Sequence, residues 1–492
     1  MRHARHIHPN LDDVTTASTP ADHSAIVVGT GFASSFFLLE YLRHAGPRAR
    51  VLVLERGGRT DPATSLKRRS NFDLRFDDMI VNRTPQKPWV QNIAFGGGSC
   101  WTGNTPRMHP NDFRTKSLYG VGVDWPLDYD TLEPYFLRVE RAMGIAGGEA
   151  GPYPRSAPYP FPAHRLNAFD EALARKYPGQ YIALPSARSS SVKTGRPVCC
   201  GSGVCSVCPV SAKFQVNLHM ADLYEDPRVT LLLEAEVERV EIEAGRVVGV
   251  QYRKDGKEMR ARGDLVAVGA HAIMTPYILL RSGLQDRALG RYLNEQLGRG
   301  VEIELDGIDN YGGGQAVTGL GTMFIDGPFR RHRAGCMIES WNLPWLRAER
   351  GRWRQRALLK AVFEDLPSFD NRVGIAPEDP GKPEVHYPAL SPYLKAGFDA
   401  LPRLIEELVR GLPVESFRVL PLEGNLGGEA HIQGTTRMGI DPGDSVVDRD
   451  LRHHRHRNLL VLGSGTFPTC MTANPTLILS ALSMRAAERL FA

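Results

Sequence analysis

A glycine-rich turn near the start of the chain, between an apolar run and a helical pattern, constrains the fold most. Residues 24–28 form the short apolar run, the turn is GTGFAS at 29–34, and an apolar helical pattern continues to about His44. In a Rossmann unit the first glycine permits the turn, the second lets the backbone approach a pyrophosphate at the helix N-terminus, and the third position needs a small residue. Here these positions hold Gly29, Gly31 and Ser34.

An acidic residue at the end of the next apolar run supports the same interpretation. That run, 50–54, leads into Glu55, and a ribose-binding acid is expected about 20 to 25 residues after such a turn. Two later runs, 264–268 and 458–462, also lead into glycines. Each predicts a further strand whose carboxyl end faces the same crevice. The sequence therefore predicts an α/β dinucleotide-binding domain assembled from distant parts of the chain.

Other patterns predict the surroundings of this domain. Alternating segments at 236–243 and 246–253 predict a hairpin lying against it. Proline and glycine at 147–162 and 377–392 predict irregular, exposed chain. The short charged run RHHRHR at 452–457 predicts a solvated loop, with a three-histidine metal site as the alternative.

Composition excludes several classes of protein. Hydrophobic residues make up 42% of the chain and charged residues 23%, which is ordinary for a folded protein and unlike disordered or collagen-like chains. Lys plus Arg number 60 against 55 for Asp plus Glu, an excess that predicts neither a nucleic-acid nor a membrane partner. No apolar run is long enough to span a bilayer, and residues 1–23 form a polar, histidine-rich tail, so a cytoplasmic location is expected.

Several blocks follow one another in a recognisable order. After the first turn come FGGGS at 95–99 with Asn104, WP at 125–126, and GAHAIMTP at 269–276. The C-terminal part holds HIQGTTRMG at 431–439, GSG at 463–465 and NPT at 474–476. With these blocks the chain resembles the glucose-methanol-choline (GMC) family of FAD oxidoreductases.

The resemblance implies a fold and a cofactor. The fold class is α/β: a discontinuous Rossmann-type FAD-binding domain of residues 24–115, 200–299 and 425–492, and a substrate-binding domain of 116–199 and 300–424 built on a mixed or antiparallel sheet. Cys100 stands where some sugar-oxidising relatives attach flavin to a histidine, so noncovalent FAD is expected, and a cysteinyl bond is the alternative. By resemblance, the residues that hold FAD are Gly29, Gly31, Ser34, Glu55, Gly97, Gly98, Cys100, Asn104, Gly465 and Thr476.

Two residues carry the expected chemistry, the oxidation of an alcohol. A base must take the hydroxyl proton while the carbon-bound hydrogen leaves as hydride, and neutral imidazole suits this role near neutral pH. The resemblance places this base at His431. The family's second site residue is here Asn474, which would hydrogen-bond the substrate hydroxyl and hold it beside the imidazole.

The expected substrate is a small, sugar-like alcohol. Glu429, Glu339, Trp341 and Asn342 lie in the expected substrate region, and carboxylates with an aromatic face would suit an amino sugar such as an aminoglycoside. Ordinary surface acids and a packed Trp are the alternative. The electron acceptor is not written in any motif. Two other functions stay open: an NAD(P)-dependent dehydrogenase, and a flavin- or cluster-binding electron carrier with no substrate.

Four of the seven cysteines fall within ten residues, in the run CCGSGVCSVCP at 199–209. Adjacent cysteines make a poor zinc chelate, whereas iron–sulfur clusters accept closely spaced ligands. The run resembles that of sugar-dehydrogenase flavin subunits with a three-iron cluster, although its final gap differs. A [3Fe-4S] cluster, a knot of structural thiols or disulfides, and zinc all stay open. The candidate ligands are Cys199, Cys200 and Cys205, with Cys208 nearby.

Overall fold

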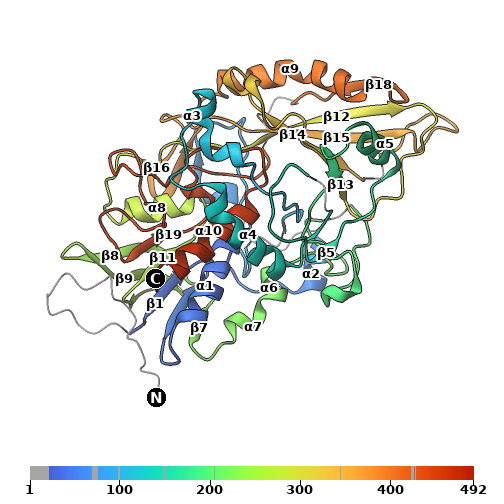
Figure 1. Cartoon of the computed structure of the whole chain (residues 1–492). Coiled ribbons are helices and arrows are strands. Elements are labelled where there is room, and N and C mark those ends of the chain that lie inside the picture. The colour runs from blue at the N-terminus through green and yellow to red at the C-terminus, as the bar shows by residue number, and fades with distance from the viewer. Residues whose placement is uncertain are drawn as a thin grey trace.

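The computed structural model describes residues 22–68, 76–97, 100–148, 151–203, 205–343, 345–422, 426 and 428–492. Two large sheets dominate it (Figure 1), one parallel and one antiparallel. The predicted tail, 1–23, lies outside these residues except for Asp22 and His23.

The parallel sheet is the predicted nucleotide-binding sheet. Its strand order is β19-β11-β1-β2-β7, and all its neighbouring pairs are parallel. The strands on either side of the glycine turn, and the two that lead into later glycines, are entirely buried, as expected for a sheet covered on both faces. The edge strand β7 was not predicted. The bounds are β1 Ala25–Val28, β2 Val51–Leu54, β7 Val229–Leu232, β11 Val266–Val268 and β19 Leu459–Val461.

Three helices share the core of this sheet: α1 (Phe32–His44), α4 (Tyr129–Met143) and α10 (Thr476–Glu488). Helix α10 packs against both α1 and α4 (Figure 1). Arg138 of α4 joins the three, because its guanidinium contacts Glu40 of α1 and lies 2.8 Å from Glu488 of α10. The C-terminal helix therefore covers the sheet beside the helix that follows the glycine turn.

The predicted hairpin is present and gains a third strand. Strands β8 (Glu236–Glu243) and β9 (Arg246–Lys254) pair antiparallel, and β10 (Lys257–Arg262) pairs with β9. The turn passes through Ala244 and Gly245, both at positive φ. The Asn458 amide, just before β19, donates to the Val247 carbonyl at 2.6 Å, which fixes the hairpin against the nucleotide-binding sheet.

The second large sheet is antiparallel and has the order β18-β12-β15-β14-β13-β6. Helix α9 (Pro392–Val409) packs its apolar face on this sheet (Figure 1). The predicted fold class, a Rossmann-type sheet with a second, antiparallel one, is confirmed. The bounds are β6 Tyr181–Ala183, β12 Leu297–Leu305, β13 Val317–Gly321, β14 Cys336–Trp341, β15 Arg356–Phe363 and β18 Val414–Val419.

One segment predicted to be irregular contains a strand. Within 377–392, strand β17 (Asp379–His386) pairs with β16 (Arg372–Ala376) and briefly with β3 (Val81–Asn82). Its two prolines sit where β17 has no partner on its second side or where its register is irregular, and proline is tolerated at such positions. The prediction of irregular chain was wrong there.

The charged run 452–457 is not a solvated loop as a whole. His453 is fully buried and its Nε2 lies 3.1 Å from a carboxylate oxygen of Asp286, which also pairs with Arg455 at 3.0 Å. Among the described residues, its three histidines do not form a group of metal ligands. The run is instead held against the domain by hydrogen bonds, including one between His454 and Ser445.

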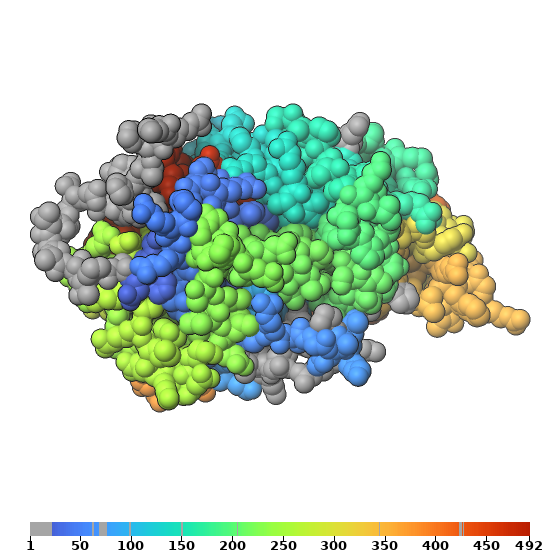
Figure 2. Space-filling view, turned by 90° about the horizontal axis from the view of Figure 1, so that it is seen from below, coloured from blue at the N-terminus to red at the C-terminus, as the bar shows by residue number. Residues whose placement is uncertain are grey.

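The remaining elements are short and connect these layers. Figure 2 shows the green part of the chain on the surface between the blue N-terminal segments and the yellow and orange antiparallel sheet. None of the described helices combines the length and apolar character needed to cross a bilayer. The helices are α2 Pro62–Arg68, α3 Thr115–Tyr119, α5 Ala168–Lys176, α6 Val216–His219, α7 Ala221–Tyr224 and α8 Met274–Arg281; the 3-10 turns are Phe76–Met79, Pro110–Arg114, Val192–Thr194, Pro328–Arg331 and Ser464–Thr466; and a further strand pair is β4 Ala146–Gly147 with β5 Phe161–Pro162.

Candidate active site

A cavity of about 450 Å³ opens where the parallel sheet meets the antiparallel one. Its walls come from the glycine turn, from the ends of β2, β11 and β14, and from three C-terminal segments, 429–432, 462–464 and 474–479. Parallel sheets bind ligands at the carboxyl ends of their strands, so the cavity lies where the sequence predicts a nucleotide site. The predicted site residues that line it are Gly29, Gly31, Glu55, Gly97, Cys100, Asn104, His431, Asn474 and Thr476.

The glycine turn has the shape that a pyrophosphate requires. Gly29 has a φ of +88°, and a Cβ there would lie 2.6 Å from the carbonyl oxygen of Gly269, so the tight turn requires glycine. Gly31 is the N-cap of α1 and makes no side-chain cap. A Cβ on Gly31 would meet no protein atom within 4 Å. The free N–H groups at this helix start therefore face open space, which suits an anion.

Glu55 secures this turn from the inside. One carboxylate oxygen accepts hydrogen bonds from the Thr30 backbone N–H at 2.9 Å and from its hydroxyl at 2.7 Å. The other accepts from the Gly57 N–H at 2.8 Å. Burial raises the pKa of Glu55, and these hydrogen bonds act in the opposite direction. The ribose contact expected of Glu55 would be made by a carboxylate that already orders the turn.

Two residues expected to touch FAD, Ser34 and Gly465, have close contacts within the protein. The Ser34 hydroxyl donates to the Val28 carbonyl at 3.1 Å. A Cβ on Gly269 would lie 2.3 Å from the Ser34 oxygen, so glycine at 269 permits this close approach of α1 to the sheet. Gly465 faces the hydroxyls of Thr435 and Thr436.

Neither Ser34 nor Gly465 lines the cavity, whereas the neighbours of Gly465, Gly463 and Ser464, do. Gly98 lies outside the described residues.

The cavity fits a flavin dinucleotide on three observations. The helix start at Gly31 offers open space for the pyrophosphate. Small residues on two sides let the backbone approach a planar ligand. The Asn474 Oδ1 atom, which belongs to a cavity-lining residue, is buried without a hydrogen-bond partner among the described residues, so it can accept a hydrogen bond from a ligand.

His431 presents a neutral imidazole to the cavity. Its Nδ1 lies 2.5 Å from the Gln296 side-chain oxygen, and its backbone N–H donates to Glu295 at 3.2 Å. Within the described part of the chain its Nε2 has no hydrogen-bond partner. Burial, with a smaller contribution from the positive charge of Lys360, lowers the pKa of His431 to about 3. The ring is therefore uncharged at neutral pH and can accept a proton.

Asn474 lines the same cavity from the loop before α10. Its amide nitrogen lies 3.4 Å from Glu339 Oε1 and donates to it. The Asn104 amide donates to the same oxygen at 2.7 Å. Glu339 is fully buried in β14 and thus orients two cavity-lining amides at once.

The carboxyl group of Glu429 completes the cavity beside His431. Lys360 of β15 lies opposite Glu339 of β14 in the strand register, and its ammonium is 2.6 Å from a Glu429 carboxylate oxygen. Burial raises the pKa of Glu429 to about 7; Lys360 opposes the shift, and Glu339 and Glu295 add to it. A Cβ on Gly298 would lie 2.0 Å from Glu429 Oε1, so this glycine makes room for the carboxylate.

The four clustered cysteines do not line the cavity. The ammonium group of Lys213 interacts both with two of them and with Cys100, which does line the cavity. Cys199, Cys205 and Cys208 are half-buried, Cys200 is exposed, and none of the seven cysteines forms a disulfide bond within the described residues. Burial lowers the pKa of Lys213 to about 8, while the thiols of Cys205, Cys208 and Cys100 act in the opposite direction. Lys213 thus lies between cavity-lining Cys100 and the cluster.

The thiols do not form a closed zinc site. Tetrahedral zinc holds its sulfur ligands about 3.8 Å apart, yet among the described residues no three of these thiols come within 4.8 Å of one another. The one group that meets that distance is Glu40, His44 and Glu488, and Arg138 already pairs with both of its carboxylates. An iron–sulfur cluster places iron and sulfide between its thiolates and so needs wider spacing.

Comparisons with known families and relatives agree with this geometry. Two models described as GMC oxidoreductase match residues 121–298 and 421–483. The fructose dehydrogenase large subunit of Gluconobacter japonicus is 27% identical, covering 94% of this chain and 96% of that protein. The paromamine 6'-oxidase of Streptomyces fradiae is 26% identical, covering 99% and 95%. The 6'''-hydroxyparomomycin C oxidase of Streptomyces lividus is 28% identical, covering 88% and 86%.

Solved structures share the fold. A pyridoxine 4-oxidase from Mesorbium loti superposes with a TM-score of 0.65 at 18% identity, covering 95% of this chain and 99% of that one. A formate oxidase of Aspergillus oryzae RIB40, a protein studied for its FAD modification, superposes with a TM-score of 0.69 at 16% identity, covering 96% and 99%.

Proposed function

The chain belongs to the GMC oxidoreductase family of FAD-dependent enzymes that oxidise alcohols, and from this premise we propose that its substrate is a sugar-like alcohol that carries an amino group. One observation supports the proposal above others. The neutral imidazole of His431 and the buried, unpartnered Oδ1 of Asn474 belong to one cavity, and the nucleotide-binding turn opens into that same cavity.

The roles of the two residues follow from their atoms. His431 Nε2 takes the proton of the substrate hydroxyl, because the imidazole is neutral and its other nitrogen is occupied. Asn474 holds the hydroxyl beside this nitrogen and reduces the freedom of the alcohol before the proton moves. FAD, when bound, supplies the acceptor for the hydride that leaves the carbon, so the alcohol becomes a carbonyl.

The proposed specificity for amino sugars rests on the Glu429 carboxylate and the Trp341 ring. Glu429 and Trp341 both line the cavity, and a carboxylate beside an aromatic face binds an ammonium group well. Lys360 lies 2.6 Å from Glu429 and 5.3 Å from the centre of the Trp341 ring. A substrate ammonium would compete with Lys360 for this carboxylate. Two of the relatives are named for aminoglycoside substrates, which supports an aminoglycoside hydroxyl, such as a 6'-hydroxyl, as the reacting group.

Anaerobic mixing tests the proposal directly. The flavin-loaded protein is mixed with matched pairs of sugars that differ in one amino group, and loss of the visible flavin absorbance is followed. We expect bleaching by the amino sugars at lower concentration than by their hydroxyl counterparts. Bleaching by neutral sugars alone would contradict the amino-sugar assignment. No bleaching by any alcohol would instead favour a flavin-binding electron carrier.

The pKa of Glu429 predicts how substrate binding depends on pH. Its carboxyl is raised to about 7 and is charged only above that value, so an ammonium substrate binds better as pH rises. We expect KM for amino sugars to fall by about 3- to 10-fold between pH 6 and pH 8, with little change for neutral sugars.

Glu429→Gln separates this effect from titration of the substrate's own amine. The variant should show a raised KM for amino sugars and lose the dependence on pH. An unchanged pH profile in Glu429→Gln would assign the dependence to another titrating group of the protein and remove Glu429 from recognition.

We also propose that Cys199, Cys200 and Cys205, with Cys208 nearby, hold an iron–sulfur cluster. Their wide placement and the buried, cationic Lys213 beside them suit an anionic cluster better than zinc. Protein purified without oxygen should contain iron and acid-labile sulfide, and Cys205→Ser should lower both while the buried Cys336→Ser does not. Iron and sulfide at background levels in the unmodified protein would contradict the cluster.

A further inference from the structure

Gln296 is a buried residue that no sequence motif singles out, and it contacts both the His431 ring and the backbone directly before Asn474. It lies immediately before β12 and is fully buried. Its side-chain oxygen faces His431 Nδ1 at 2.5 Å. Its side-chain nitrogen donates to the Met471 carbonyl and, at 3.1 Å, to the Ala473 carbonyl. Ala473 directly precedes Asn474.

The chemistry of these partners fixes the direction of each hydrogen bond. Backbone carbonyls accept and cannot donate, so the NH₂ group of Gln296 must face Met471 and Ala473. Its oxygen, which only accepts, then faces His431 Nδ1. A neutral imidazole carries one proton, and the short contact with an acceptor places that proton on Nδ1. The lone pair of Nε2 is left to face the cavity.

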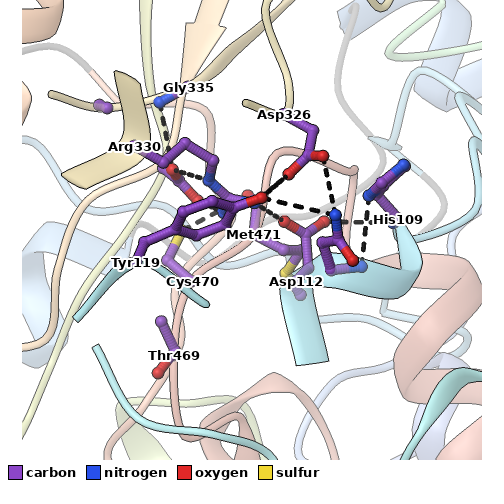
Figure 3. A network of polar contacts seen from close by, with 12 residues as sticks. His109, Asp112, Tyr119, Asp326, Arg330, Gly335, Thr469, Cys470 and Met471 are labelled. Atoms are coloured by element: carbon purple, nitrogen blue, oxygen red, sulfur yellow. Dashed lines mark hydrogen bonds and ion pairs between the residues drawn. The ribbon is translucent and has the colours of Figure 1, made fainter. Parts of the chain in front are cut away.

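The loop that accepts from Gln296 is itself held rigidly. Thr469 exchanges hydrogen bonds with the backbone of Val123, at 2.7 Å in both directions. Figure 3 shows Cys470 and Met471 beside Arg330 and Asp112, whose ion pair of 2.7 Å is fully buried. A rigid loop presents its carbonyls at fixed positions, so the Gln296 amide has one favourable orientation.

We propose that Gln296 is a positioning residue that fixes His431 in its Nδ1–H tautomer and fixes the imidazole against the loop that carries Asn474. The inference rests on the proposed function, in which His431 Nε2 takes the hydroxyl proton. Without the Gln296 amide, the imidazole would exchange its proton between the two nitrogens, and half-turned rings would present an N–H to the alcohol.

The carboxylates around the His431 imidazole bind other partners, and the group that contacts Nδ1 is the Gln296 amide. Glu295 contacts the backbone N–H of His431 and pairs with the buried Lys87, while Glu429 pairs with Lys360. Glu339 accepts hydrogen bonds from the side-chain amides of Asn104 and Asn474. Among the described residues, none of these carboxylates contacts Nδ1. An acceptor without charge orients the ring without stabilising its protonated form, which keeps the base neutral.

The first test reads the tautomer without using activity. Flavin-loaded protein labelled with ¹⁵N-histidine is studied by NMR, and the His431 signals are assigned by their loss in His431→Asn. We expect the unmodified protein to show a proton on Nδ1 and a bare Nε2. A proton on Nε2 in the unmodified protein would overturn the proposal.

The second test uses Gln296→Met with Gln433→Met as its control. Gln433 is equally buried and nearby, but its side-chain amide has no hydrogen-bond partner among the described residues. We expect Gln296→Met to give mixed tautomers and to lower kcat by about 10- to 100-fold with KM almost unchanged, at normal flavin content. Gln433→Met should change neither the His431 tautomer nor kcat. An unmixed Nδ1–H tautomer in folded Gln296→Met would contradict the proposal.

The outcomes separate this inference from the function on which it rests. If the tautomer is as expected but no alcohol bleaches the flavin, the proposed function fails and the positioning of the ring stands. If amino sugars bleach the flavin while His431 carries its proton on Nε2, the function stands and Gln296 does not set the tautomer.

Discussion

His431→Ala is expected to lower kcat by about 10²- to 10⁴-fold, the usual contribution of a general base, while flavin stays bound. The imidazole is the proton-accepting group proposed for the cavity, and burial lowers its pKa to about 3, so it is unprotonated across the neutral range. Removing it leaves the substrate hydroxyl beside Asn474 with no base. Single-turnover bleaching of the flavin by an amino sugar measures the effect without interference from later steps.

A matched control distinguishes loss of the base from loss of structure. His454 also has its pKa lowered by burial, but it bonds to Ser445 and does not line the cavity. His454→Ala should therefore bleach at the normal rate. A folded, flavin-loaded His431→Ala protein that turns over like the unmodified one would remove His431 from the mechanism.

Gly31→Val is expected to weaken FAD binding strongly while the protein still folds. A Cβ at Gly31 meets no protein atom within 4 Å, so a valine is accommodated by the chain itself. The methyl groups of the valine would occupy the space at the start of α1 where a pyrophosphate would accept hydrogen bonds from the backbone N–H groups of the helix. A loss of about 3 kcal/mol of binding free energy weakens FAD binding by about 100-fold. The FAD content of the purified protein measures this directly.

Gly46→Val is the matched control, because a Cβ at Gly46 also meets no protein atom within 4 Å but lies beyond the far end of the same helix. It should keep its FAD. Full FAD content in Gly31→Val would show that the dinucleotide does not lie over this turn, and the whole assignment of the cavity would change with it.

The nucleotide-binding half of the fold could be predicted because its signals are local. The apolar runs before Gly29 and Gly269 become β1 and β11, within two residues of the predicted start of each strand. The alternating segments become β8 and β9 for the same reason. Strands buried on both faces are apolar throughout, and tight turns at positive φ favour glycine, so both features appear directly in the sequence.

Features that depend on distant partners could not be predicted in this way. The prolines of β17 indicate a turn, yet the strand forms because β16 pairs with it from one side. His453 lies in a charged run that predicts a solvated loop, and it is buried because it pairs with Asp286, which is far away in the sequence. Likewise the contact of the Ser34 hydroxyl with the Val28 carbonyl carries no signal in the sequence, and its assignment to FAD stays a prediction.

The candidate site shows the same division. His431 and Asn474 could be named because they fall in blocks typical of a family, and the structure brings both to one cavity. Gln296 and Lys360 could not, since a glutamine before a strand and a lysine within one carry no signal of their own. Their roles depend on the register of β14 against β15 and on the path of the loop before α10.

A crystal structure of the flavin-loaded protein with a bound amino-sugar inhibitor tests the central claim most directly. We expect the sugar hydroxyl to lie within hydrogen-bond distance of both His431 Nε2 and the Asn474 side chain, with the amino group against Glu429 and the pyrophosphate of FAD at the start of α1. An inhibitor bound with its hydroxyl away from either side chain, or FAD absent from the space over Gly31, would contradict the account.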